Sequence, residues 1–159
     1  MENFINSLNS AEQRIRTADH IIYITYPLIK EKRLIKKIIE ELYESANSII
    51  NTILSYEKFY KRIESNENPL TTFKEKCAPN FNISPSELQT IFELFSLMEK
   101  YKESSMEFIR KDRLVIMNNN LKTESISIDN LKRYLSVIKI ILQKTKTKIE
   151  QESFRLRKI

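Results

Sequence analysis

The sequence predicts an all-α fold: an elongated bundle of four to five helices, with a long central helix and a small β-hairpin before the last helix. Apolar residues recur at spacings of three and four along most of the chain, which is the period of an amphipathic helix. One β-branched stretch around three asparagines, "RLVIMNNNLKTESIS", interrupts this period. The length of 159 residues suits a single helical-bundle domain over 1–159.

The first half of the chain carries two helical patterns. The first covers about residues 3–25 and is expected to end before Pro27, because proline lacks an amide donor and disfavours helical geometry in the preceding residue. The second covers about residues 31–64, and a helix of that length spans about 50 Å. It is therefore predicted to be the spine of an elongated molecule. Its apolar seam consists of Ile35, Ile39, Leu42, Ala46, Ile49, Ile53, Tyr56, Tyr60 and Ile63.

Proline and serine mark where the next helices begin. A short helix is predicted over 69–77, since Pro69 fits the first helical turn. Ser84 and Glu87 have the spacing of a capping box, with Pro85 at the first helical position, and they predict a helix over 85–103. The residues expected to face inward from this helix are Leu88, Ile91, Phe92, Phe95 and Met98.

The β-branched stretch predicts a hairpin that pairs 113–117 with 121–127. Three asparagines separate the two runs, and asparagine tolerates left-handed turn geometry better than most residues. A lone hairpin is marginal in water, so this one is expected to pack on a helix. The last helix is predicted over 129–156.

Composition excludes several classes of site. The chain has no glycine, and therefore has no Walker or Rossmann phosphate-binding loop. Cys77 and His20 are the only cysteine and histidine, which excludes a disulfide within the chain and a Cys/His zinc site. We expect no cofactor and no metal. The N-terminus lacks a signal-peptide pattern, and the longest apolar run falls short of the roughly 20 residues that span a membrane, so we expect a cytoplasmic protein without a membrane partner.

The net charge of +6 is concentrated at the C-terminus. Residues 129–159 carry nine basic and three acidic side chains, whereas the rest of the chain is balanced. Such a stripe is able to follow a phosphate backbone and release its counterions; the alternative is a solvated face that only keeps the protein soluble. The cations predicted to bind nucleic acid from this helix are Lys132, Arg133, Lys139, Lys144, Lys146, Lys148 and Arg155.

A second basic cluster precedes the hairpin. Arg110, Lys111 and Arg113 surround Asp112 in the stretch "RKDR", and arginine binds phosphate or carboxylate with two parallel hydrogen bonds. We therefore predict that these three residues help the basic helix to bind nucleic acid. In the alternative interpretation, Asp112 pairs with its basic neighbours, and the apolar residues of the hairpin only cover the end of the bundle. These residues are Leu114, Ile116 and Ile126.

The single histidine belongs to a third candidate site. Arg16 and Tyr23 fall on the same side of the predicted helix as His20. Such a cluster is suited to acid–base work on RNA, with the arginine stabilising charge on a phosphate and the histidine moving a proton. In the alternative, His20 is a hydrogen-bonded structural residue at a buried helix end.

Two stretches carry a family resemblance. "ADHIIYITYPLIKEKRL" (18–34) and "FIRKDRLVI" (108–116) resemble a group of small uncharacterised all-helical proteins from archaea with reduced genomes, whose motifs carry no assigned chemistry. Arg14 and His20 are also spaced as in the HEPN superfamily, helical bundles that are often RNases or nucleotidyltransferase partners. Ile15 stands where that family usually has a polar residue, and the motif lies in the first helix rather than a later one.

Three functions follow as expectations. The first is a non-enzymatic protein that binds RNA or a ribonucleoprotein through its basic C-terminal helix. The second is a HEPN-like RNase centred on His20, Arg16 and Tyr23. The third is an interaction or scaffold module that binds a protein partner, or a second copy of itself along the seam of the long helix.

Overall fold

The computed structural model describes residues 2–64 and 68–157. Helices make up most of the chain, and three short strands precede the last helix. In chain order, the elements are α1 Glu2–His20, the π-helix η1 Ile21–Thr25, α2 Tyr26–Ile29, α3 Lys32–Phe59, α4 Pro69–Thr72, the π-helix η2 Phe73–Cys77, the 3-10 helix η3 Pro79–Phe81, α5 Pro85–Glu103, β1 Met106–Arg110, β2 Arg113–Met117, β3 Thr123–Ser127 and α6 Ile128–Arg157.

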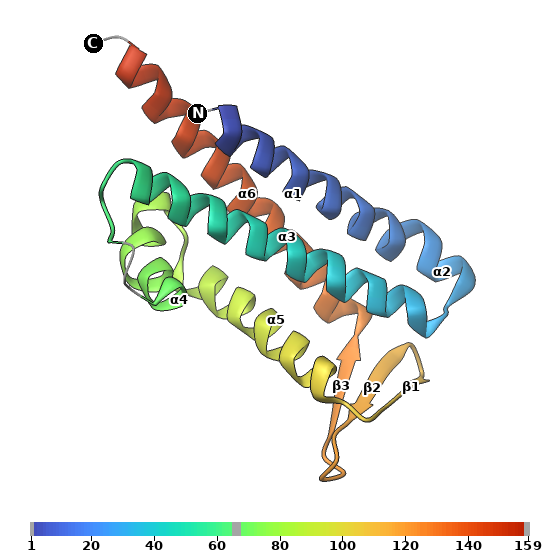
Figure 1. Cartoon of the computed structure of the whole chain (residues 1–159). Helices are drawn as coiled ribbons and strands as arrows, with labels where there is room; N and C mark the ends of the chain where they lie inside the picture. Colours follow the sequence, from blue (N-terminus) through green and yellow to red (C-terminus); the bar gives the residue numbers. More distant parts are fainter. Residues whose placement is uncertain (1, 65–67, 158–159) are drawn as a thin grey trace.

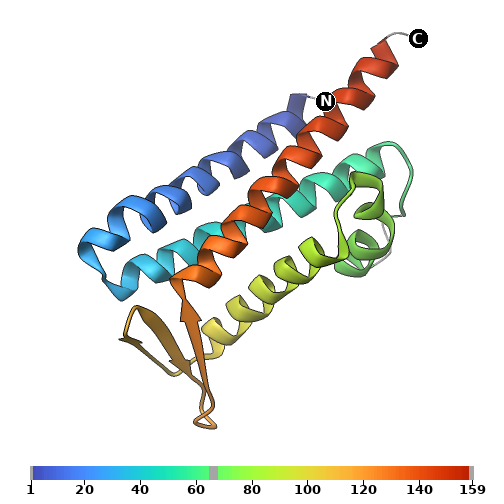
Figure 2. The ribbon, with the colours of Figure 1, turned by 180° about the vertical axis from the view of Figure 1, so that it is seen from behind.

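The helices α1, α3, α5 and α6 lie side by side and give the molecule its elongated shape (Figures 1 and 2). Helix α6 packs against each of the other three. The sheet sits at one end of the bundle, and the N-terminal turn of α1 and the C-terminal turn of α6 lie at the other end. One continuous hydrophobic core, extending from Leu8 to Ile149 along the sequence, joins the helices to the sheet.

The long helix α3 confirms the predicted spine, although it ends at Phe59 rather than near residue 64. The chain turns at Lys61, whose φ is +58°, and this turn brings Ile63 back to the core. Ile35 and Ile53 are fully buried, because α1, α5 and α6 cover the seam within the same chain. The seam is therefore occupied and is not an open surface for a second copy.

The first helical segment continues past Pro27. After His20 the backbone winds as a π-helix, in which the amide of Tyr26 donates to the carbonyl of Ile21. Pro27 then stands in the first turn of α2, where its missing donor costs little. The segment ends at Lys30, which is left-handed with φ +52°. The prediction that Pro27 ends the helix was therefore wrong.

Other element boundaries follow the sequence closely. Ser84 and Glu87 form the predicted capping box, with Pro85 in the first turn of α5. Pro69 begins α4, and the side chain of Asn68 accepts hydrogen bonds from the first amides of that helix. Local side-chain chemistry therefore set these helix starts, as the sequence predicted.

The predicted hairpin is part of a three-stranded antiparallel sheet in the order β1-β2-β3. Strand β1 was missed because the turn that joins it to β2 consists of Lys111 and Asp112. Both have positive φ, +51° and +61°, and Arg110 pairs with Arg113 across them. This is the geometry of a type I′ turn, which asparagine and glycine usually occupy.

The β2–β3 turn also differs from its prediction. Its left-handed residue is Leu121, with φ +61°, rather than one of the asparagines. Asn118 instead accepts hydrogen bonds through its side-chain oxygen from the amides of Asn120 and Lys122. The asparagine therefore stabilises the turn through its side chain, and a leucine adopts the strained backbone.

Candidate functional site

The cations of α6 that face α5 are tied to that helix. Arg133 pairs with Glu93, with 2.7 Å between Nη2 and a carboxylate oxygen. Lys144 lies 2.6 Å from Glu87 and donates to the carbonyl of Asn82 at 2.7 Å. Burial raises the pKa of Glu87, but the bond from Lys144 and those at the α5 cap outweigh it, so the pKa lies below its ordinary value.

The cations of α6 that face α1 are tied in the same way. Lys146 lies 2.8 Å from Glu12, and its hydrogen bond lowers the pKa of that carboxyl. Lys139 forms an ion pair with Asp19. These side chains therefore hold α6 to its neighbours, and the predicted free stripe is largely an internal set of ion pairs.

The three other predicted cations of α6 differ from one another. Lys148 lies 3.5 Å from Glu152 on its own helix. Arg155 is exposed near the C-terminal end and makes no ion pair with a described residue. Lys132 lies near the sheet, with its ammonium 5.2 Å from the centre of the Tyr23 ring. Of the predicted α6 cations, only Lys132 is therefore both unpaired and close to the second basic cluster.

That second cluster, which we call the cationic turn, consists of Arg110, Lys111 and Arg113. All three are exposed, and none makes an ion pair within the part of the chain that the structure describes. Asp112 was expected to pair with these neighbours, but it lies 3.7 Å from Lys30 at the end of α2. Arg110 and Arg113 stand directly opposite each other across the strands, a placement of like charges that costs stability.

A hollow of about 360 Å³ connects the cationic turn to α6. Four basic and two acidic side chains line it. Tyr26 also lines it; this residue is only 3% exposed, and its hydroxyl has no hydrogen-bond partner among the described residues. Burial, and next the charge of Asp112, raise the pKa of Tyr26. The lining of this end hollow consists of Ile22, Tyr26, Pro27, Lys30, Lys111, Asp112, Arg113, Ser127, Ile128, Asp129 and Lys132.

The structure also brings the predicted catalytic residues together. His20, Arg16 and Tyr23 line one hollow of about 540 Å³ beside α6, where the π-helix begins directly after the histidine. Arg16 lies 3.5 Å from Glu12. Arg14 lies 3.4 Å from Glu41 on α3 and lines a different hollow from His20, so the two residues of the HEPN spacing are not neighbours.

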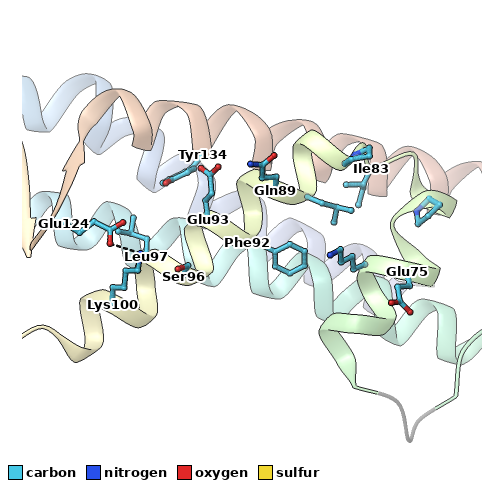
Figure 3. Close-up of a pocket in the computed structure, with 14 residues that line it drawn as sticks. Glu75, Ile83, Gln89, Phe92, Glu93, Ser96, Leu97, Lys100, Glu124 and Tyr134 are labelled. Atoms are coloured by element: carbon cyan, nitrogen blue, oxygen red, sulfur yellow. Dashed lines mark ion pairs between the residues drawn. The ribbon is translucent and has the colours of Figure 1, made fainter. Parts of the chain in front are cut away.

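A groove of about 1070 Å³ was not predicted by the sequence. It runs along α5 and reaches Tyr134 of α6, and Figure 3 shows its lining. Phe92 was expected to face inward. It packs against the core but is only half-buried, and it also lines the groove, with the Lys74 ammonium 6.0 Å from its ring centre. Lys100 and Glu124 pair at 2.8 Å. An apolar floor with polar groups at the edge accommodates an apolar ligand face.

Comparisons with known proteins add no assignment to these sites. Within residues 2–64 and 68–157, no group of three or more His, Cys, Asp or Glu side chains is arranged to hold a metal ion. No helix in these ranges is long and apolar enough to cross a bilayer. A search of protein-family models, of curated proteins and of solved structures finds no match to the chain.

Proposed function

We propose that this protein is a non-enzymatic RNA-binding protein, and that the sheet end of the bundle carries the binding surface. The surface consists of the cationic turn together with Lys132 of α6. One observation carries the proposal: Arg110, Lys111, Arg113 and Lys132 make no ion pair with a described residue, whereas most predicted cations elsewhere on α6 hold carboxylates.

The distinction between paired and unpaired cations decides the energetics. A cation that neutralises a phosphate gains affinity by releasing condensed counterions. Lys144 and Lys146 would first have to give up Glu87 and Glu12, and each bond lost would offset that gain. Arg110, Lys111 and Arg113 have no such bond to break. A bound phosphate would in addition offset the repulsion between the opposed Arg110 and Arg113.

The end hollow supplies further polar contacts to the same surface. Lys111, Arg113 and Lys132 line it together with the first turn of α6. A helix N-terminus favours anions through its free amides and its dipole. These groups suit a phosphate oxygen, and the carboxylates of Asp112 and Asp129 limit the net charge.

Titration of labelled single-stranded RNA at two salt concentrations tests the proposal. We expect affinity to fall steeply with salt, and the double variant Lys111→Glu/Arg113→Glu to lose at least tenfold in affinity. Arg155→Glu is the control for position, because it reverses one exposed cation at the opposite end of α6, with half the charge change of the double variant. Loss of binding in Arg155→Glu, with the turn variant unaffected, would move the surface to the far end of α6.

An RNase is the second candidate, favoured by the shared hollow of His20, Arg16 and Tyr23. A denaturing gel run on every titration sample separates it from the first. Intact RNA supports a binding protein. Cleavage that persists through repurification and disappears in His20→Ala, with the helical signal unchanged, would establish the RNase and contradict the non-enzymatic proposal.

A further inference from the structure

One face of the three-stranded sheet is turned away from the bundle. Successive side chains of a strand point to opposite faces, and Leu114, Ile116 and Ile126 occupy the face that is buried against the helices. The neighbours of these residues along the strands therefore form the outer face. The outer face consists of Met106, Phe108, Arg110, Arg113, Val115, Met117, Thr123, Ser125 and Ser127.

The middle of this outer face is apolar and partly open to solvent. Phe108 stands opposite Val115, and Met106 opposite Met117. Phe108 is 39% exposed and Met106 is 56% exposed. Phe108 makes no ring–ring contact with any described aromatic residue. An aromatic ring is thus available on a flat backbone surface.

The charges of the sheet are divided between its two faces. Glu107 and Glu124 alternate onto the bundle face, where they lie 3.7 Å from Lys36 and 2.8 Å from Lys100. The outer face carries Arg110 and Arg113 and no carboxylate on any of the three strands. Its remaining polar groups are the hydroxyls of β3. An anionic ligand therefore meets no repulsion from the outer face.

We propose that the outer face binds unpaired RNA bases, with Phe108 as the stacking residue, and that the protein consequently prefers single-stranded to double-stranded RNA. This inference rests on the proposed function, because the cationic turn must hold the phosphates beside the stacked bases. The ring of Phe108 lies two residues from Arg110 on the same face, so one nucleotide can contact both through its base and its phosphate.

The dimensions of the face set the length of RNA that it holds. From Arg113 to Met117, β2 advances about 14 Å at 3.4 Å per residue. Sheets that stack bases on exposed aromatic residues hold two or three bases, which this length accommodates. The exposed Lys122 in the β2–β3 turn lies beyond the other end of the strand and places a second cation along the path. In a duplex the bases are already paired and stacked, so only phosphate contacts remain.

The test compares a short labelled oligouridylate with a duplex of equal length at one salt concentration. Phe108→Ala is expected to lower single-strand affinity between about fivefold and a hundredfold, the range for loss of one stacked base, and to leave duplex affinity unchanged. Phe108→Tyr keeps an aromatic ring and is expected to retain the preference. Leu156→Ala is the control, since Leu156 is an exposed apolar residue near the C-terminal end of α6, far from the sheet at which that helix begins.

Each outcome separates this inference from the function on which it rests. Equal loss on single strands and duplexes in Phe108→Ala, or no loss on either, overturns base stacking while RNA binding through the cationic turn stands. Absence of binding to both RNAs overturns the function and the inference together. A solution mass above 19.0 kDa that returns to the monomer value in Phe108→Ala would show that a second copy covers this face, and would also overturn the inference.

Discussion

Left-handed backbone geometry falls on residues that are poorly suited to it. The chain has no glycine, and a non-glycine residue loses roughly 1–2 kcal/mol in the left-handed region. The sequence predicted such geometry at the three asparagines of the β2–β3 turn because their side chains tolerate it, yet none of these three adopts it. The described residues with positive φ are Lys30, Lys61, Asn82, Lys111, Asp112 and Leu121.

Leu121→Gly should therefore stabilise the protein. Leu121 is 77% exposed with φ +61°, so the substitution relieves backbone strain while removing little packing. Glycine offsets part of this gain, because it increases the conformational entropy of the unfolded chain. The free energy of unfolding is therefore expected to rise by up to about 1 kcal/mol. Urea unfolding measures the change.

Leu28→Gly provides the control for that measurement. Leu28 is also exposed, but it lies in the helical turn α2, where glycine lowers stability by about 1 kcal/mol relative to a good helix former. Opposite signs for the two leucines are expected. A loss of stability in Leu121→Gly would show that the leucine side chain contributes more than its backbone costs.

At the scale of elements, the sequence predicted what depends on local signals. The seam of α3 and the capping box of α5 were correct because each rests on residues a few positions apart. Strand β1 was not predicted, because the turn that joins it to β2 contains neither asparagine nor glycine and so gave no sign of a hairpin. The π-helix that lets the chain pass Pro27 was also missed, because no local residue pattern marks it.

Substitutions that improve the geometry of the Lys111–Asp112 turn are expected to raise the stability of the fold and to weaken RNA binding. Lys111→Asn with Asp112→Gly installs the residues that a type I′ turn prefers and should raise the melting temperature by a few degrees, for a gain of roughly 1 kcal/mol. The same change removes one cation from the proposed RNA surface, so RNA affinity should fall.

Thermal unfolding and RNA titration of this turn variant are measured on the same preparation. The single variant Asp112→Gly, which keeps Lys111, separates the two effects. It should gain stability and bind RNA at least as tightly as the wild type, because it removes a carboxylate from the same surface. Unchanged affinity in the double variant would remove Lys111 from the binding surface.

At the scale of the whole molecule, ion pairs between distant segments explain why the proposed binding surface lies at the sheet end of the bundle and not along the whole of α6. Lys146 and Glu12 are 134 positions apart, and no sequence pattern predicts that they meet. The sequence therefore shows which residues are basic but leaves open which of them the fold neutralises. Arg110, Lys111 and Arg113, which make no ion pair with a described residue, lie in or beside a tight turn, where few carboxylates are within reach.

The same ion pairs predict a loss of stability in acid. The pKa values of Glu12, Glu87 and Glu152 lie below their ordinary value of 4.5. For Glu152, burial acts to raise the pKa, but hydrogen bonds from Tyr56 and Arg62 outweigh it. Because the unfolded chain binds protons at these carboxyls more readily, their contribution is complete above pH 4.5 and is lost as the pH falls through the folded pKa values.

Urea unfolding between about pH 6 and pH 3 measures this dependence. Lys144→Ala/Lys146→Ala should be less stable at the upper pH and should lose less stability on acidification, because Glu87 and Glu12 no longer have their partners. Lys58→Ala is a matched control, since Lys58 is exposed on α3 and makes no ion pair within the described ranges. Parallel pH curves for the double variant and the wild type would contradict this origin.

The direct junction between β3 and α6 has a mechanical consequence. Strand β3 ends at Ser127 and α6 begins at Ile128, so no loop absorbs motion between the sheet and a helix of 30 residues. A helix of that length is about 45 Å long, and tilting it by about 5° at the sheet displaces its far end by about 4 Å. A change in the orientation of the sheet must therefore be accommodated along α6 and by the three helices against which α6 packs.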